Sequence, residues 1–186
     1  MSSPRKNRPK RRLGRDDWLG AAMIVLAEHG AGALKAEPMA RHMQTTKGSF
    51  YWHFRDVPDF HAQILARWET GAMAAADAAA TEAGSAPERL RALAQALADP
   101  GPERAAEAAI RAWAATDPGA HDTLGRIDAA RRAALRGLLH ETGISNPEMA
   151  QIIHAAAVGM ALLDETGAEA RRAAIGSLVD LVLALR

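Results

Sequence analysis

Apolar side chains recur along this chain at the three- and four-residue spacing of helices, and glycine and proline separate one such segment from the next. In the first segment, Trp18, Ala22 and Val25 would share one face, and Gly30 follows as a typical C-terminal glycine. No segment alternates polar and apolar residues as a half-buried strand would. The pattern predicts an all-α fold of about nine helices, over residues 15–29, 36–43, 46–54, 56–80, 85–99, a segment ending at 116, 117–141, 145–163 and the stretch after 167.

Several helix starts are marked by capping residues. Ser85 followed by Glu88, and Ser145 followed by Glu148, have the spacing of capping boxes, in which serine caps the helix and glutamate is its third residue. Pro38 would lie in the first turn of its helix, where a missing N–H costs little.

The net charge of +1 conceals an asymmetry. The first 15 residues hold seven basic side chains and no acidic one, whereas the remaining 171 hold 16 basic and 22 acidic side chains. A basic segment on a mildly acidic body indicates a polyanionic partner for that segment. The alternatives are a solubilising tail or a cloning remnant.

Composition excludes several classes of protein. The chain has no cysteine, so disulfides, thiolate chemistry and cysteine-ligated zinc are ruled out. No apolar run approaches the ~20 residues of a membrane span, and no signal peptide is apparent, so we expect a cytoplasmic protein with no membrane contact. The seven histidines show no metal-binding spacing, and neither a phosphate loop nor a nucleophile elbow is present. We therefore expect no enzyme, no metal and no cofactor.

Residues 34–54 have the pattern of a helix-turn-helix, with Gln44 and Thr45 in the turn and Thr46 as the cap of the next helix. Five residues, 50–54, hold four of the chain's eight aromatic side chains. Phe50 and Phe54 are four apart and would be buried together, whereas Tyr51, Trp52 and His53 would project outwards beside Lys47 and Ser49. This arrangement favours a helix that reads DNA. The alternative is that all the aromatic side chains pack internally and the helix is only structural.

The string TTKGSFYWHFRD at 45–56 resembles the recognition-helix signature of the tetracycline-repressor (TetR) family of bacterial regulators. The family pattern before this helix also agrees at Ala21-Ala22, Glu28-His29-Gly30 and Ala40. The resemblance extends over about residues 15–68. It implies that the start of the recognition helix meets DNA, that Tyr51 and His53 bind phosphates, and that Trp52 touches a phosphate, sugar or thymine methyl. The expected DNA-binding residues are Arg11, Arg12, Lys35, Thr45, Thr46, Lys47, Gly48, Ser49, Tyr51, Trp52 and His53.

Three positions depart from the family pattern. Gln44 stands where glycine is usual, so we expect either that it adopts a positive φ at some strain or that the turn differs slightly. Lys35 replaces the usual threonine cap of the second helix and could contact a phosphate instead. Val57 stands where a phosphate-binding lysine is common.

The resemblance also implies a three-part organisation: a basic arm at 1–14, a helix-turn-helix domain at 15–58, and a helical domain for effector binding and dimerisation at 59–186. Large apolar side chains among many alanines suggest an effector pocket lined by Trp68, Met73, Leu97, Trp113 and Leu124. Stripes on the last two helices suggest a dimer interface of Ile152, Ile153, Ala156, Met160, Leu163, Ile175, Leu178, Val179 and Val182. For both sets the alternative is that the side chains form the core of a single chain.

The expected function is therefore a homodimeric transcriptional regulator that binds a palindromic duplex and is released by an unidentified small molecule. Repression is the expected outcome, and activation is the alternative. A non-specific architectural DNA-binding protein and a constitutive DNA-binding factor without an effector are the rival interpretations.

Overall fold

A computed structural model describes residues 13–81, 83–98, 106–162 and 167–184. Within these ranges every regular element is helical, which confirms the predicted fold class. The elements are α1 (Arg15–His29), a short 3₁₀ helix η1 (Ala31–Ala33), α2 (Ala36–His42), α3 (Lys47–His53), α4 (Val57–Thr81), α5 (Ala86–Ala98), α6 (Glu107–Ala114), α7 (Pro118–Glu141), α8 (Pro147–Leu162) and α9 (Ala168–Ala184).

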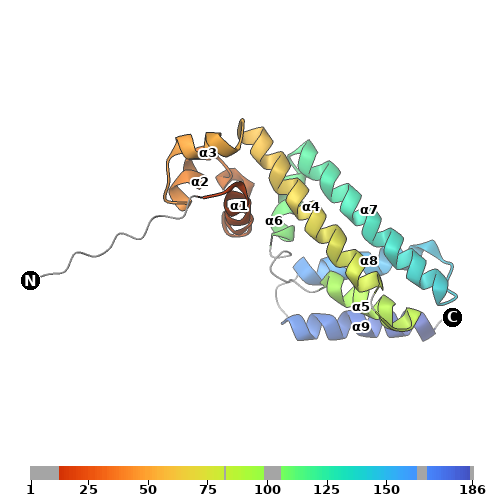
Figure 1. The fold of residues 1–186 in the computed structure, drawn as a ribbon. Coiled ribbons are helices and arrows are strands. Elements are labelled where there is room, and N and C mark those ends of the chain that lie inside the picture. Colours follow the sequence, from red (N-terminus) through yellow and green to blue (C-terminus); the bar gives the residue numbers. More distant parts are fainter. Residues whose placement is uncertain (1–12, 82, 99–105, 163–166, 185–186) are drawn as a thin grey trace, which may run out of the picture.

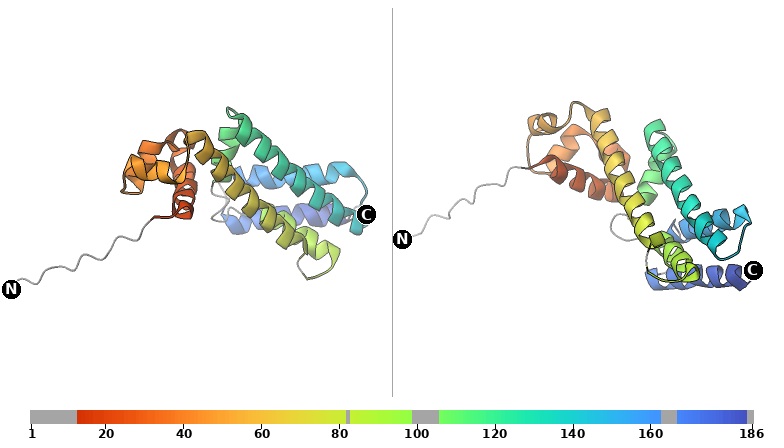
Figure 2. Two further views of the ribbon diagram at one scale, coloured as in Figure 1. Left: turned by 45° about the horizontal axis from the view of Figure 1, so that its top comes forward. Right: turned by 45° about the vertical axis from the view of Figure 1, so that its right-hand side comes forward.

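The long helix α4 connects the two parts of the molecule. Helices α1, α2 and α3 gather around its N-terminal end, and α5 and α7 pack along the rest of it (Figure 1). Helix α7 runs beside α4, while α8 and α9 lie together with α5 at the far end (Figure 2). The three helices of the N-terminal group are therefore carried at one end of a larger helical body.

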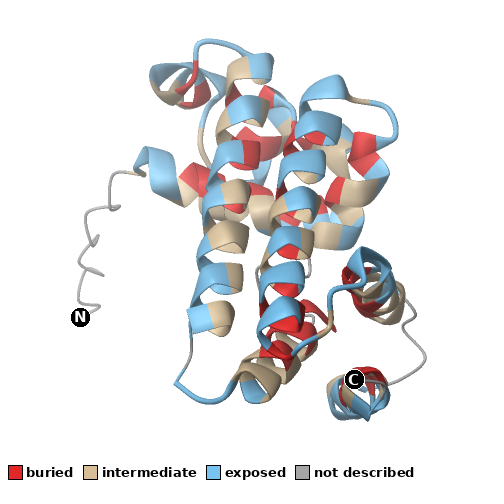
Figure 3. Ribbon diagram, turned by 90° about the vertical axis from the view of Figure 1, so that its right-hand side faces the viewer, coloured by how far each residue is buried: buried red, intermediate tan, exposed pale blue. Residues whose placement is uncertain are grey.

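Two apolar cores hold this arrangement together. The first contains Trp18, Phe50 and Phe54 together with side chains from α4, α6 and the start of α7. The second is formed by α5, the end of α7, α8 and α9, and includes Leu93, Leu135 and Ile153. Buried stripes alternate with exposed faces along the paired helices α4 and α7 (Figure 3). Because the first core crosses from the N-terminal helices into α4 and α6, the expected boundary at residue 58 falls inside one packed unit.

Most helix ends follow the sequence signals, with one exception. Glu88 accepts hydrogen bonds from both the backbone amide and the hydroxyl of Ser85, and the amide bond is one half of the predicted capping box. The predicted cap at Ser145 is wrong, because α8 begins at Pro147 and the Asn146 side chain accepts the bond from the Glu148 amide at 2.9 Å. Proline has a helical φ and no N–H, so it suits the first helical position and moves the cap to the residue before it.

No helix in the described ranges is both long enough and apolar enough to cross a bilayer.

Candidate nucleic-acid interface

Helices α2 and α3 and the tight turn between them form a helix-turn-helix. The turn is closed by the Thr45 amide, which donates to the carbonyl of Ala40 at 2.9 Å. Thr46 caps α3, as expected, because its hydroxyl accepts a hydrogen bond from the Ser49 amide at 3.2 Å. A seven-residue helix is too short to be stable alone, so this cap and the packing beneath it determine where α3 lies.

Gln44 adopts a left-handed conformation, with φ of 51°. It is the only non-glycine residue with a positive φ in the ranges that the structure describes, which confirms the strain expected at this position. A side chain in this region approaches the following carbonyl oxygen too closely, at a cost of about 1–2 kcal/mol. The turn of the helix-turn-helix therefore stores strain that glycine would not have.

Gln44→Gly is expected to raise the free energy of unfolding by about 0.5 kcal/mol, because the relieved strain exceeds the extra entropy that glycine loses on folding. Thermal unfolding measures the change. Gln44→Ala is the matched control: it keeps the Cβ and the strain, so its stability should not exceed that of the parent chain. A glycine variant that is less stable than the alanine variant would show that the turn is not strained.

Aromatic side chains anchor α3 from below. Trp18 of α1 packs edge-on against Phe50, with ring centroids 5.6 Å apart, and also against Phe54 at 6.4 Å. Phe60 of α4 completes the group, at 5.1 Å from Phe50 and 4.7 Å from Phe54. All four rings are buried, which confirms the shared inward face predicted for Phe50 and Phe54. Edge-to-face packing of this kind holds α3 in one orientation.

The opposite face of α3 is open. The Trp52 side chain is 80% exposed and that of Tyr51 47%, so the interpretation in which all the aromatic side chains are internal is wrong. Thr46, Lys47 and Gly48 are exposed beside them, and Lys35 is exposed at the start of α2. Thr45, Ser49 and His53 are half-buried. Arg11 and Arg12 lie outside the described residues.

One contact that holds α3 could not be found by sequence reasoning. Arg15, the first residue of α1, donates a hydrogen bond from its Nη2 to the backbone carbonyl of His53 at 3.0 Å. Because this carbonyl lies at the C-terminal end of α3, a cation there also interacts favourably with the helix dipole. The two residues are 38 positions apart, and no local motif links them.

The helix-turn-helix domain has little net charge of its own. Residues 15–58 hold five basic and five acidic side chains. Lys35, which caps α2 through its backbone alone, has no side-chain capping bond, as its substitution for threonine predicted. The excess of positive charge in the N-terminal part of the sequence therefore comes from the basic residues before residue 15.

The structure separates the residues predicted to line an effector pocket. Trp68 and Trp113 are buried in the first core, and Met73 and Leu124 pack against it. Leu97 lies in the second core, away from the other four. A pocket of about 210 Å³ at the start of α8 is lined by none of the five; its lining residues are Arg132, Arg136, Pro147, Glu148, Ala150 and Gln151.

The residues predicted to form a dimer interface are also divided. Ile153, Ile175, Val179 and Val182 are buried in the second core, so their side chains pack within the chain and are not available to a partner. This corrects the expectation for these four, because one face of each helix is needed to close the core against α5. Ile152 is 46% exposed, and Ala156, Met160 and Leu178 are half-buried. Leu163 lies outside the described residues.

This helix-turn-helix buries one face of its second helix and exposes threonine, lysine, tyrosine and tryptophan on the other. Such an arrangement is typical of DNA-binding proteins. A family model described as bacterial regulatory proteins of the tetR family matches residues 19–56, which include α2, the turn and α3. Residues 19–56 are therefore similar to the DNA-binding part of bacterial regulatory proteins of the tetR family.

Solved structures show that the fold likeness extends over nearly the whole chain. A transcriptional regulator from Rhodococcus sp. is 22% identical, with a TM-score of 0.77, covering 92% of this chain and 97% of its own. A protein from Saccharomonospora viridis, solved in complex with choline, is 16% identical with a TM-score of 0.78, over 89% and 95%. The TetR-family regulator PfmR from Thermus thermophilus is 19% identical with a TM-score of 0.69, over 90% and 96%. Among curated proteins, no sequence matches this chain.

Proposed function

We propose that this chain is a homodimeric transcriptional repressor that binds a palindromic operator through α3 and releases it when a small molecule binds the helical body. The observation that carries the proposal is the outward face of α3. A large side chain such as Trp52, 80% exposed on a helix that is firmly anchored from behind, indicates a surface that is covered by a partner. The basic segment at the N-terminus, next to a domain of balanced charge, favours a polyanion as that partner.

The DNA contacts of α3 would divide into two kinds. Tyr51 and His53, with Lys35, Lys47, the turn residue Thr45 and the capping residue Thr46, would bind phosphates and position the helix. Gly48 would let the backbone approach the groove, and Ser49 and Trp52 would reach base edges or the thymine methyl. Phosphate contacts set register and base contacts set sequence choice, so specificity would depend on few side chains.

Pairing would use the outer faces of α8 and α9. Six large apolar side chains are exposed in the described ranges, and three of them, Ile152, Leu162 and Leu181, are on these two helices. The half-buried Ala156, Gly159, Met160 and Leu178 lie on the same helices and are small or flexible enough for close helix packing. A symmetric pair would place two copies of α3 about 34–36 Å apart, one turn of duplex, so that both could enter successive major grooves.

An effector would bind in the part of the body that includes the first core. Trp68, Met73, Trp113 and Leu124 gather there from α4, α6 and α7, and Leu97 is no longer included. His61 lies against Trp113, with ring centroids 4.9 Å apart, and is within 2.8 Å of the Leu34 carbonyl next to α2. A ligand that moved Trp113 would therefore disturb a contact to the DNA-binding domain directly. The choline bound to the protein from Saccharomonospora viridis supports a small-molecule site in this fold.

Selection of bound duplexes from a random pool, followed by sedimentation of the complex, tests the proposal. The expected result is a palindromic consensus bound by two copies of the chain, with protection of a short site in footprinting. An architectural protein would instead select no consensus and protect DNA of any sequence. Release of the selected duplex by small molecules, choline among the first tested, together with a change in tryptophan fluorescence, tests the effector. A duplex that no ligand releases would favour a constitutive factor.

Deletion of residues 1–12 is expected to weaken operator binding and to make it less sensitive to salt. The deletion removes six basic side chains and leaves a DNA-binding domain of balanced charge. For each DNA phosphate that is no longer neutralised, the slope of log affinity against log salt concentration should become shallower by about 0.9. Titrations at several salt concentrations measure the slope. An unchanged slope would show that the basic segment does not touch DNA.

A further inference from the structure

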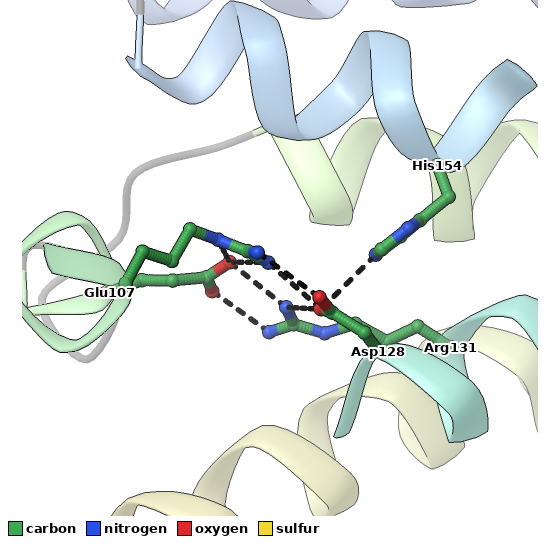
Figure 4. A network of polar contacts seen from close by, with 5 residues as sticks. Glu107, Asp128, Arg131 and His154 are labelled. Atoms are coloured by element: carbon green, nitrogen blue, oxygen red, sulfur yellow. Dashed lines mark hydrogen bonds and ion pairs between the residues drawn. The ribbon is translucent and has the colours of Figure 1, made fainter. Parts of the chain in front are cut away.

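A cluster of five charged or titratable side chains joins three helices inside the body (Figure 4). Arg131 of α7 forms a bidentate pair with Glu107 of α6, through hydrogen bonds of 3.0 and 2.9 Å. Arg111 of α6 bridges both carboxylates, at 2.9 Å from Glu107 and 2.8 Å from Asp128 of α7. His154 of α8 lies with its Nε2 3.4 Å from the Asp128 carboxylate. The cluster therefore ties α6 to α7 and α7 to α8.

The cluster is deeply enclosed and its charges are balanced. The side chains of Arg131 and His154 are 3% and 7% exposed, and those of Glu107, Arg111 and Asp128 are between 13% and 18% exposed. Two guanidinium groups match two carboxylates, so moving either arginine away would weaken the pairing of a largely buried carboxylate. Bidentate contacts of this kind are directional, so they fix an orientation as well as a distance.

The carboxylates are charged at neutral pH. Burial by itself would raise the pKa of Glu107, but hydrogen bonds and positive charge from Arg131 and Arg111 outweigh it and lower that pKa. Burial would likewise raise the pKa of Asp128, but the adjacent His154 ring and hydrogen bonds from Arg111 bring it far below its usual range. Both carboxylates thus remain ionised in the folded chain wherever they are ionised in the unfolded chain.

Protonation of Glu107 and Asp128 is expected to lower the stability of the folded chain at acid pH. Because their pKa values are lower in the folded chain, their stabilising contribution is complete above the ordinary values of 4.5 and 3.8 and is lost as the pH falls through the folded values. The unfolding temperature should therefore hold between pH 7 and about pH 5 and fall below about pH 4. Glu107→Gln should flatten this acid limb; a variant with the parent's limb would show that Glu107 has the same pKa in both states.

Of the three helices that the cluster joins, α6 is the one that packs against the DNA-binding domain. It has only eight residues, so its position depends on the contacts on its faces. One face carries Glu107 and Arg111 into the cluster. Ile110 and Trp113 are buried in the first core with Trp18, and α6 packs against both α1 and η1. The cluster thus holds one side of the helix that the DNA-binding domain packs against on the other.

We propose that Glu107, Arg111, Asp128, Arg131 and His154 are positioning residues that set the angle of α6, and with it the placement of the DNA-binding domain relative to α7 and α8. This inference rests on the proposed function, because the pairing of α8 is what would convert the placement of one domain into the separation of two recognition helices. Buried ion pairs seldom add net stability over apolar residues of similar size, whereas they can specify one arrangement among several. The cluster would fix one arrangement of α6, α7 and α8 at the point where the three helices meet.

The test compares two paired substitutions that remove the same charges. Glu107→Leu with Arg131→Met removes the bidentate pair and leaves Asp128 matched by Arg111 and His154. Glu69→Leu with Arg126→Met is the control, since it removes an equally bidentate pair between α4 and α7, at 2.6 and 2.8 Å, that is outside the cluster and partly exposed. Because the chain has no cysteine, nitroxide labels can be placed at Ile24→Cys on α1 and Ala133→Cys on α7, both at exposed positions.

Pulsed electron paramagnetic resonance then gives the distribution of distances between the two labels of one chain. The labelled chain is diluted with unlabelled chain so that only intrachain pairs contribute. The expected result is a shifted or broader distribution for the cluster variant alone, with an unfolding temperature equal to or above that of the parent. Its affinity for the selected duplex should fall by about 5- to 150-fold, while the control keeps the parent's affinity. An unchanged distribution in a folded cluster variant overturns the proposal.

Two further arms keep the outcomes distinct. If the cluster variant does not fold, Glu107→Gln takes its place, because it removes the negative charge and turns one of the two oxygens that accept from Arg131 into an NH2 donor. An unchanged distribution in this variant overturns the proposal in the same way. If the parent chain selects no duplex or does not pair, the proposed function fails. The intrachain distances still decide whether the cluster places the DNA-binding domain, because they require neither DNA nor a partner.

Discussion

Replacing Trp52 by alanine is expected to abolish most operator binding while leaving the fold intact. A good contact to a base is worth about 1–3 kcal/mol, and in a symmetric pair the substitution acts twice, so we expect a loss of about 2–6 kcal/mol, or roughly 30-fold to 20,000-fold in affinity. The side chain is 80% exposed, so the free energy of unfolding should change by no more than about 0.5 kcal/mol. Titration of the selected duplex and thermal unfolding measure the two quantities.

Ile24→Ala is the matched control for this substitution. Ile24 is a large apolar side chain on α1 that is 54% exposed, and it is not among the residues expected to contact DNA. Its loss should change neither affinity nor stability. If Trp52→Ala binds the operator as tightly as Ile24→Ala does, α3 is not the recognition helix and the proposed function is wrong.

Trp18→Ala is expected to have the largest effect on stability. Trp18 is fully buried and packs edge-on against Phe50 and Phe54, so its removal leaves a cavity directly behind α3. Truncation of a buried tryptophan costs about 3–5 kcal/mol, a large share of the 5–15 kcal/mol that stabilises a typical domain. Because α3 then loses its support, operator binding should be lost as well. Denaturant unfolding gives the first quantity and duplex titration the second.

Trp18→Phe separates the packing of the ring from its N–H group. Trp18 Nε1 is buried and has no hydrogen-bond partner among the described residues, so replacing the indole by a phenyl ring breaks no hydrogen bond. This variant should keep the edge-on contact with Phe50 and cost about 1 kcal/mol. Equal losses for the phenylalanine and alanine variants would show that the aromatic contact does not anchor α3.

The helix-turn-helix could be predicted from the sequence almost completely, because its determinants are local. The cap at Thr46 and the opposed faces of α3 follow from residues within a few positions of one another, whereas the left-handed conformation of Gln44 was expected from the resemblance to a family with glycine there. Helical geometry alone places Phe50 and Phe54 on one side and Tyr51 and Trp52 elsewhere. Where a local rule competed with another, the prediction failed: Ser145 had the spacing of a cap, but Pro147 moved the helix start by one residue.

The helical body could be predicted only as a set of helices. Apolar stripes on α8 and α9 indicate that a face is covered, but not whether the cover is the same chain or a second one. The structure buries Ile153, Ile175, Val179 and Val182 against α5 and α7, and leaves Ile152 outside. For the same reason the sequence could not show that Leu97 belongs to a different core from the other residues expected around an effector.

What the sequence by itself determined is the class of fold and the exposed face of α3, since both depend on periodicity and on interactions between near neighbours. Only the tertiary structure decided which charges meet. Arg15 reaches His53 across 38 positions, and Glu107, Asp128 and His154 come together from three helices because of how those helices cross. Crossing angles arise from the packing of whole helix faces, which no single motif encodes.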